Sequence, residues 1–188
     1  MEGNAARWAA LADSADGTVV RPWCPADLES TLAIFNQAVA QTTSTWSWFP
    51  KTPRQWADYC QARLQAPYSC LVAERAGAVV GYAATGPFRD RDGYRATAEN
   101  AVYVTPSCHG QGVGSRLLGA LIERSRAQGL HVLVAALDST NTVSAALHTK
   151  FGFHEVGRLS QIGQKFGRWL DLTLWQLTLD NRPTPPRP

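Results

Sequence analysis

The feature that most constrains the fold is a glycine-rich turn between two apolar segments, AVYV-TPSC-HGQGVG-SRLL at residues 101–118. The segment before the turn predicts a strand, and the leucines after it predict a helix. Glycine permits positive φ angles and lets a ligand approach the backbone closely. Because a helix N-terminus carries about half a positive charge, the turn predicts either a seat for a pyrophosphate or a simple turn with positive φ.

Two familiar phosphate-binding loops do not fit this turn. A Walker A loop has Lys and then Ser or Thr after its second glycine, and that lysine is missing here. A dinucleotide fingerprint has G-x-G-x-x-G directly after the strand, whereas TPSCH intervenes and the third glycine comes one residue early. On spacing alone, pyrophosphate binding and a structural turn both stay open.

The remaining periodicity predicts an α/β chain with a mixed sheet covered by helices. Leu28, Leu32, Phe35 and Val39 fall on one face of a helix that begins at Pro25. Strands are expected at 18–21, 69–75, 78–86, 97–104, 131–137, 153–160 and 168–179, and further helices at 53–64, behind the glycine turn as far as Gly129, and at 141–151.

Composition limits the class of protein. We expect one domain at 18–180, a flexible N-terminal extension at 1–17 and a flexible Pro-rich tail at 181–188. A net charge of +3 is too small for a nucleic-acid-binding surface, and no apolar run is long enough to span a membrane. The start has no signal-peptide pattern, so we expect a soluble, cytoplasmic protein. The 4 cysteines lack metal-ligand spacing, and no metal is expected.

Several motifs resemble the GNAT superfamily of acetyl-CoA-dependent N-acetyltransferases. HGQGVG is similar to its pyrophosphate loop, Q/R-x-x-G-x-G/A, with His109 in place of Gln or Arg. The segment from Asn141 to Phe153 is similar to its second coenzyme-contacting segment. FNQAVAQTTSTW, GPFRDRDGYRATAENAVYV and GQKFGRWLDLTLWQL resemble the phosphinothricin N-acetyltransferase branch, which acetylates the α-amine of small amino acids such as phosphinothricin or methionine sulfoximine.

The resemblance covers roughly residues 19–179 and implies the GNAT fold, with a twisted mixed sheet of about seven strands and about four helices. It implies acetyl-CoA as co-substrate and a homodimer. It also implies coenzyme contacts from Val102, Tyr103, Val104, His109, Gly110, Gln111, Gly112, Val113, Gly114, Ser115, Arg116, Asn141 and Ser144. The substitution at His109 affects one side-chain contact and leaves the backbone contacts unchanged. Independently of the resemblance, Asn141 is a good helix N-cap.

Two residues are candidates for catalysis. A carboxylate can take the proton of an attacking amine directly or through one water, and Glu99 in TAENAVYV matches the glutamate that the resemblance implies as base. His148 occupies the position where many GNAT enzymes have a tyrosine that protonates the departing thiolate, and the branch has histidine there. From residue type alone, a solvated glutamate and a packed histidine remain the alternatives.

An α-amino acid also presents a carboxylate, which a cation would bind. Arg89 and Arg91 lie in the loop before Glu99, and Lys165 lies in GQKFGRW; these three are the candidates for substrate binding, with solvated loop charges as the alternative. Two other functions stay open. The acceptor could be a protein N-terminus, a polyamine or an antibiotic amine, or the chain could be an acyl-CoA-binding sensor without turnover.

Overall fold

The structure is a computed structural model that describes residues 17–65 and 67–185. The expected N-terminal extension therefore lies outside the described residues except for Gly17, and the expected tail is described only as far as 185. The side chain of Arg182 donates to the carbonyl oxygens of Gly129 and Leu130, which holds the chain after the last strand against the turn before β5.

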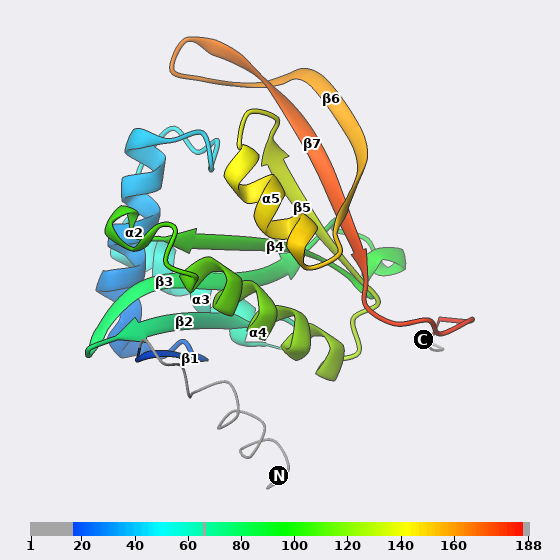
Figure 1. Ribbon diagram of the computed structural model, residues 1–188, viewed down its shortest axis with the longest axis horizontal. Coiled ribbons are helices and arrows are strands. Elements are labelled where there is room, and N and C mark those ends of the chain that lie inside the picture. Colours follow the sequence, from blue (N-terminus) through cyan, green and yellow to red (C-terminus); the bar gives the residue numbers. More distant parts are fainter. Residues whose placement is uncertain (1–16, 66, 186–188) are drawn as a thin grey trace, which may run out of the picture.

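Seven strands form one sheet in the order β1-β2-β3-β4-β5-β7-β6, and four α-helices accompany it in the described residues (Figure 1). Neighbouring strands are antiparallel except for the parallel pair β4–β5. The expected mixed α/β fold is confirmed. The elements are β1 (Thr18–Pro22), η1 (Pro25–Asp27), α2 (Leu28–Gln41), α3 (Pro53–Leu64), β2 (Cys70–Arg75), β3 (Ala78–Pro87), η2 (Asp92–Tyr94), β4 (Thr97–Val104), η3 (Pro106–Cys108), α4 (Val113–Ala127), β5 (Val132–Asp138), α5 (Thr142–Lys150), β6 (His154–Lys165) and β7 (Arg168–Thr178).

The two faces of the sheet are covered by different helices. Helices α2 and α3 bury Trp56 and Phe35 against Val72 and Tyr82. On the opposite face, α4 packs against the neighbouring residues of β2 and β3, such as Leu71. Successive strand residues point to opposite faces, so Tyr103 of β4 lies with α2 and α3, whereas Val102 and Val104 lie with α4. This alternation decides which side of β4 each candidate residue can serve.

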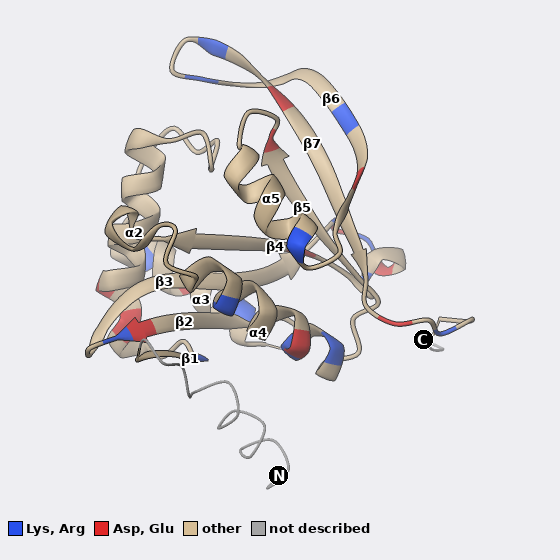
Figure 2. Ribbon diagram, in the orientation of Figure 1, with Lys and Arg blue, Asp and Glu red and all other residues tan. Residues whose placement is uncertain are grey.

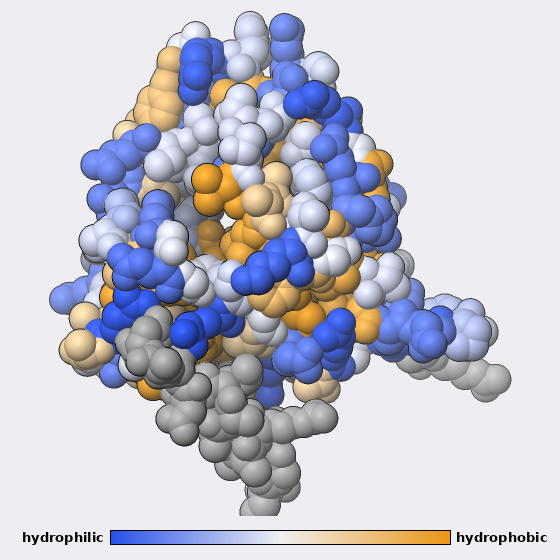
Figure 3. Space-filling model, viewed as in Figure 1, coloured by the Kyte–Doolittle hydropathy of each residue, from blue (hydrophilic) through white to orange (hydrophobic). Residues whose placement is uncertain are grey.

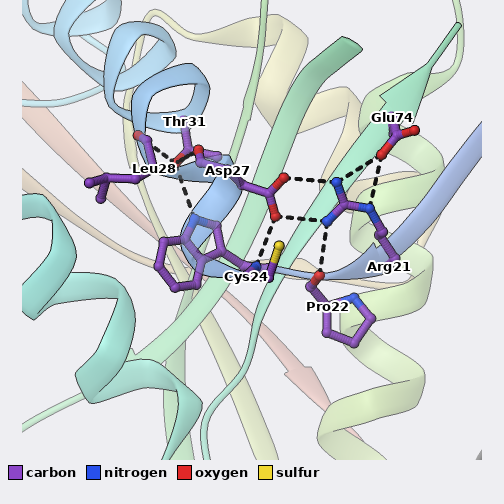
Figure 4. Close-up of polar contacts among 8 residues, drawn as sticks. Arg21, Pro22, Cys24, Asp27, Leu28, Thr31 and Glu74 are labelled. Carbon is purple, nitrogen blue, oxygen red and sulfur yellow. Dashed lines mark hydrogen bonds and ion pairs between the residues drawn. The ribbon is translucent and has the colours of Figure 1, made fainter. Parts of the chain in front are cut away.

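An arginine fixes the corner where β1 leads into η1 (Figure 4). The guanidinium of Arg21 donates to both carboxylate oxygens of Asp27, at 2.7 and 2.8 Å, and also to Glu74 on β2. Asp27 in turn accepts from the backbone N–H of Cys24. The Arg21 guanidinium and these hydrogen bonds hold the pKa of Asp27 below its usual range although burial raises it. The start of α2 is thereby attached to the edge of the sheet.

Two elements differ locally from the sequence prediction. Strand β6 continues to Lys165, past the expected end at 160, and crosses an irregularity between Leu159 and Gly163 where Gln161 has a φ of 54°. On α2 the fully buried positions are Thr31, Ile34, Phe35 and Val39, while Leu28 and Leu32 are only partly buried. Thr31 is buried because its hydroxyl accepts the indole N–H groups of Trp23 and Trp56. No helix in the described part of the chain is long and apolar enough to cross a membrane.

Candidate active site

The glycine turn leaves open space at the start of α4, and we call this turn the candidate anion seat, or anion seat for short. Gly110 and Gly112 have φ angles of 73° and 81°, and a Cβ atom added to either would meet no atom within 4 Å. Gly112 is the N-cap residue, and no side chain caps this end of the helix. The first N–H groups of an α-helix have no partner within the helix. Backbone donors and open space therefore occur together here, which suits a phosphate.

Side chains of the same loop mainly shape it. His109 Nε2 donates to the carbonyl oxygen of Val104 at 2.9 Å, which folds the loop back on the end of β4. Gln111 donates to the carbonyl oxygen of Ser107 and accepts from Arg75. Val113 is fully buried under the loop. Because these groups bind protein partners, the loop offers a ligand chiefly its backbone.

Basic residues lie beside this seat. Figure 2 shows blue positions on α4 and at the C-terminal end of α5. Lys150, the last residue of α5, has its Nζ 3.4 Å from the hydroxyl of Ser115 in the first turn of α4. Arg116 follows one residue later and is half-buried. Lys150 was not singled out from the sequence, because only the fold brings the end of α5 to the start of α4.

Strands β4 and β5 separate beyond Glu99. Their parallel pairing covers Thr97 to Glu99 on β4, and the rest of β4 has no partner in β5 among the described residues. Val102, Tyr103 and Val104 pair with β3 on one side only, so their other side faces the gap. The space-filling view shows an opening bordered by hydrophobic residues where Figure 1 places the gap between β4 and α5 (Figure 3). An extended chain could pair with this edge of β4 as another strand would.

Glu99 lies where the two strands part. It points to the α2–α3 face, is half-buried and sits opposite Gly86 of β3. Burial raises the pKa of Glu99, while the nearby Arg89 and Arg63 guanidinium groups lower it in part. No described residue donates a hydrogen bond to its carboxylate. An unpaired carboxylate with a raised pKa is suited to accept a proton.

His148 lies on the other face of β4, within α5. It is 2% exposed, and its Nδ1 donates to the carbonyl oxygen of Ser144 at 2.8 Å. Its Nε2 accepts from the side-chain amide of Asn100 at 2.9 Å. Burial lowers the pKa of His148, so the ring is neutral near pH 7. Asn100 was missed in the sequence; its position next to Glu99 on a strand already implied that it faces the opposite side.

Asn141 caps α5 as expected. Its side-chain oxygen accepts the backbone N–H of Ser144 at 3.0 Å. Its amide nitrogen donates to the hydroxyl of Ser44 at 3.4 Å, in the loop after α2. The hydroxyl of Tyr103 donates to the backbone carbonyl of the same Ser44 at 3.2 Å. The structure therefore places both candidate coenzyme residues against the loop that borders the gap.

Lys165 is a buried cation that holds this loop. Its Nζ donates to the carbonyl oxygens of Thr42 and Thr45, both at 2.7 Å, and burial lowers its pKa. Beside it, the ring of Trp46 fills the space over Gly163 of β6. One N–H of the ammonium group remains after these two bonds.

The two loop arginines are more exposed. The guanidinium of Arg89 lies 4.4 Å from the centre of the Phe88 ring and donates to the carbonyl oxygen of Phe88. Arg91 is exposed at the start of η2. Arg89 is close enough to Glu99 to lower its pKa, as described above. The structure thus brings Arg89 to the Glu99 side of the sheet, whereas Arg91 is exposed to solvent.

The sequence pattern of the acetyltransferase (GNAT) family matches residues 33–153. This range includes the separated strands, the glycine turn and α5 described above.

The chain belongs to the acetyltransferase (GNAT) family.

Members of this family are acyltransferases, so the expected family and enzyme class are confirmed. The chain is 50% identical over 156 residues to the L-methionine sulfoximine/L-methionine sulfone acetyltransferase of Pseudomonas paraeruginosa, covering 82% of this chain and 91% of that protein. It is 37% identical over 169 residues to the phosphinothricin N-acetyltransferase of Streptomyces viridochromogenes, covering 90% and 91%. An acetyltransferase from Salmonella typhimurium, solved with acetyl-CoA, has a TM-score of 0.88 at 40% identity and covers 90% of this chain and 98% of that one.

Proposed function

We propose that this GNAT enzyme transfers the acetyl group of acetyl-CoA to the α-amine of a small amino acid or amino acid analogue. The observation that carries the proposal is the position of Glu99, an unpaired and half-buried carboxylate where β4 and β5 separate, on the strand that leads into the anion seat. The names of the similar enzymes, which act on methionine sulfoximine, methionine sulfone or phosphinothricin, support this acceptor class.

The residues of the coenzyme side suit acetyl-CoA. The backbone of residues 109–116 would hold the pyrophosphate at the start of α4, where Gly110 and Gly112 leave open space. The free side of β4 at Val102 to Val104 would pair with the amide groups of the pantetheine arm. Asn141 and Ser144 border the same gap. Bound there, the thioester supplies an activated acetyl group.

On the α2–α3 face of β4, where we expect the acceptor to bind, Glu99 removes a proton from the acceptor amine. The amine must be neutral to attack the thioester carbonyl carbon, and Glu99 accepts its proton directly or through one water. A C–N bond forms and the C–S bond breaks, so the sulfur leaves as a thiolate that needs a proton or a hydrogen bond. The transfer is direct, with no acetyl group held by the protein.

We place His148 near that thiolate. The Nδ1–H of His148 donates to Ser144, and its Nε2 carries no proton because it accepts from Asn100. The ring must therefore release Asn100 and take up a proton from solvent at Nε2 before it can donate that proton to the sulfur. Because burial lowers its pKa, the resting ring is neutral and does not carry a spare proton at pH 7.

The acceptor carboxylate needs a cationic surrounding. Arg89, Arg91 and Lys165 are the candidates from the sequence, and their charges would attract an anionic acceptor group to the Glu99 side. Lys165 also shapes this side, because it holds the loop after α2 over β6.

We further propose a cytoplasmic homodimer. Strand β6 ends the sheet, and along this edge strand Val156, Leu159 and Ile162 are 50%, 43% and 58% exposed. Edge strands that expose apolar side chains are usually covered. A second copy of the chain would cover this one, and light scattering on the purified protein measures the mass.

The test is thiol release from acetyl-CoA across a panel of acceptors. We expect L-methionine sulfone, L-methionine sulfoximine or phosphinothricin to be acetylated far faster than peptides and polyamines. Faster turnover of a peptide or polyamine would show that this compound, and not a small amino acid, is the preferred acceptor. Tight acetyl-CoA binding with no thiol release from any acceptor would favour a sensor instead.

A further inference from the structure

Arg63, in the last turn of α3, is held in a fixed orientation on the α2–α3 face. The Cζ atom of its guanidinium lies over the ring of Tyr59, 3.4 Å from the ring centre, and its Nη1 donates to the carbonyl oxygen of Tyr59 at 3.2 Å. Such a cation–π contact orients the planar group. The guanidinium is therefore held in one orientation before any ligand binds. Arg63 was not among the candidate site residues from the sequence.

A glycine makes room for this guanidinium next to Glu99. A Cβ atom at Gly86 would lie 2.9 Å from Nη2 of Arg63, so the guanidinium occupies the space that a side chain would fill. Gly86 is the cross-strand partner of Glu99 in the β3–β4 pair. Cross-strand partners point to the same face, with Cβ atoms about 4.5–5.5 Å apart. Arg63 thus lies beside the carboxylate of Glu99.

The charge of Arg63 is not neutralised by a close ion pair. No carboxylate of the described residues lies within the ion-pair distance of 4.0 Å from it, Glu99 included. The Tyr59 contacts use one face of the guanidinium and one N–H, which leaves further N–H donors. The raised pKa of Glu99 agrees with the absence of a direct pair.

We propose that Arg63 binds the α-carboxylate of the acceptor and so selects free amino acids; the inference rests on the proposed function. In an α-amino acid the amine and the carboxylate are attached to one carbon. When the amine meets Glu99, the carboxylate lies within reach of a cation next to Glu99. A guanidinium binds a carboxylate through two parallel N–H donors. Lys165 has two of its three donors occupied, and Arg89 is exposed above Phe88.

The experiment compares L-methionine sulfone with its carboxamide, which keeps the amine and the side chain but lacks the carboxylate charge. For Arg63→Gln we expect kcat/KM for the free acid to fall about 100-fold, because the acceptor carboxylate loses its cationic partner. For the carboxamide we expect a change of less than about threefold. Arg63→Lys should recover part of the loss, since it restores the charge without the two-donor geometry.

Two further variants separate this role from folding. Gly86→Ala leaves Arg63 in place but displaces its guanidinium, and should reduce the same preference for the free acid. Arg54→Gln removes an arginine from the exposed start of the same helix and should change neither acceptor. Thermal unfolding and acetyl-CoA affinity, measured for each variant, show whether the protein is folded.

The outcomes distinguish this proposal from the proposed function. Equal losses for the acid and the carboxamide in Arg63→Gln, with wild type active on the acid, would overturn the role of Arg63 alone. A wild-type enzyme that acetylates neither compound would overturn the amino acid acceptor and the role of Arg63 with it. A selective loss for the free acid in both Arg63→Gln and Gly86→Ala supports the assignment.

Discussion

The two faces of strand β4 meet the two proposed substrates by different physical means. On the α4–α5 side, the proposed anion seat would consist of backbone N–H groups in open space around Gly110 and Gly112. On the α2–α3 side, the site consists of side chains from separate elements, with Glu99 on β4 and Arg63 on α3. A backbone site is encoded in adjacent residues, whereas a side-chain site forms only after distant segments have packed together.

The largest expected effect concerns the acceptor side. Glu99→Gln keeps the volume but removes the proton acceptor, and we expect kcat/KM at pH 7 to fall about 10²–10⁴-fold. The difference in kcat/KM between wild type and Glu99→Gln should become smaller toward pH 9.5, where more of the acceptor amine is already neutral. In wild type, activity should be lost as the pH falls through the pKa of Glu99, which burial places above its ordinary value.

The control for this variant is the affinity for acetyl-CoA, which should change less than about twofold because Glu99 lies away from the anion seat. A Glu99→Gln enzyme within about threefold of wild type at pH 7 would remove Glu99 from the mechanism.

A smaller effect is expected on the coenzyme side. Gly112→Val should weaken acetyl-CoA binding at least about tenfold, because the added side chain enters the space where the pyrophosphate approaches the backbone. Calorimetric titration of the folded variant measures this.

Gly129→Val is the matched control. Gly129 follows the other end of the same helix with a φ of 78° and similarly open surroundings. Both substitutions carry a left-handed backbone cost of about 1–2 kcal/mol. Only Gly112→Val should change acetyl-CoA affinity. Equal affinities in the two variants would show that the glycine turn is a structural turn and does not bind the pyrophosphate.

A third change tests whether the acceptor side can be altered by itself. A Cβ atom at Gly163 would lie 2.3 Å from the ring of Trp46, so Gly163→Ala should push the loop after α2 away from β6. We expect a loss of about 1–3 kcal/mol in the free energy of unfolding. The acceptor KM should rise by a larger factor than the Kd for acetyl-CoA, although Ser44 of the same loop contacts Tyr103 and Asn141. A variant that loses coenzyme affinity instead would show that the loop serves both substrates.

The smallest effect concerns the buried pair on the α5 side. Asn100→Ala removes the donor to His148 Nε2 and should cost about 1 kcal/mol of stability. Because the neutral ring loses a hydrogen bond, the pKa of His148 should rise toward its ordinary value of 6.5. Nitrogen NMR of the histidines measures both the pKa and the tautomer. A ring protonated at pH 7 in wild type would contradict the neutral Nδ1–H form.

Much of the fold was predictable because its signals are local. The helix expected from Pro53 to about Leu64 matches α3. Ala76 and Gly77, which lie between the two expected strands 69–75 and 78–86, form the β2–β3 turn and both have positive φ. The prolongation of β6 was not predictable, since Gln161 has a positive φ that only the tertiary pairing stabilises. The partial exposure of Leu28 and Leu32 follows from the indole hydrogen bonds that bury Thr31 instead.

The residues of the candidate site also divide into those that neighbouring sequence predicts and those that only the tertiary fold brings together. The glycine turn and the Asn141 cap are read from neighbouring residues, and the backbone geometry at both agrees with that reading. Arg63 could not be found from sequence, because its place beside Glu99 depends on the register that sets Gly86 opposite Glu99. Lys165 was a candidate for substrate binding, with a solvated loop charge as the alternative. The structure excludes the solvated charge, because the loop after α2 covers Lys165 and supplies two carbonyl acceptors.

The most direct test of these substrate positions is a crystal structure of the dead-end complex of this protein with coenzyme A and L-methionine sulfone. We expect the pyrophosphate on the backbone of residues 109–116, and the acceptor amine within hydrogen-bond distance of Glu99 or one water away. The acceptor carboxylate should lie on Arg63. An acceptor amine bound away from Glu99, or a pyrophosphate bound elsewhere than at the start of α4, would contradict the division of β4 into a coenzyme side and an acceptor side.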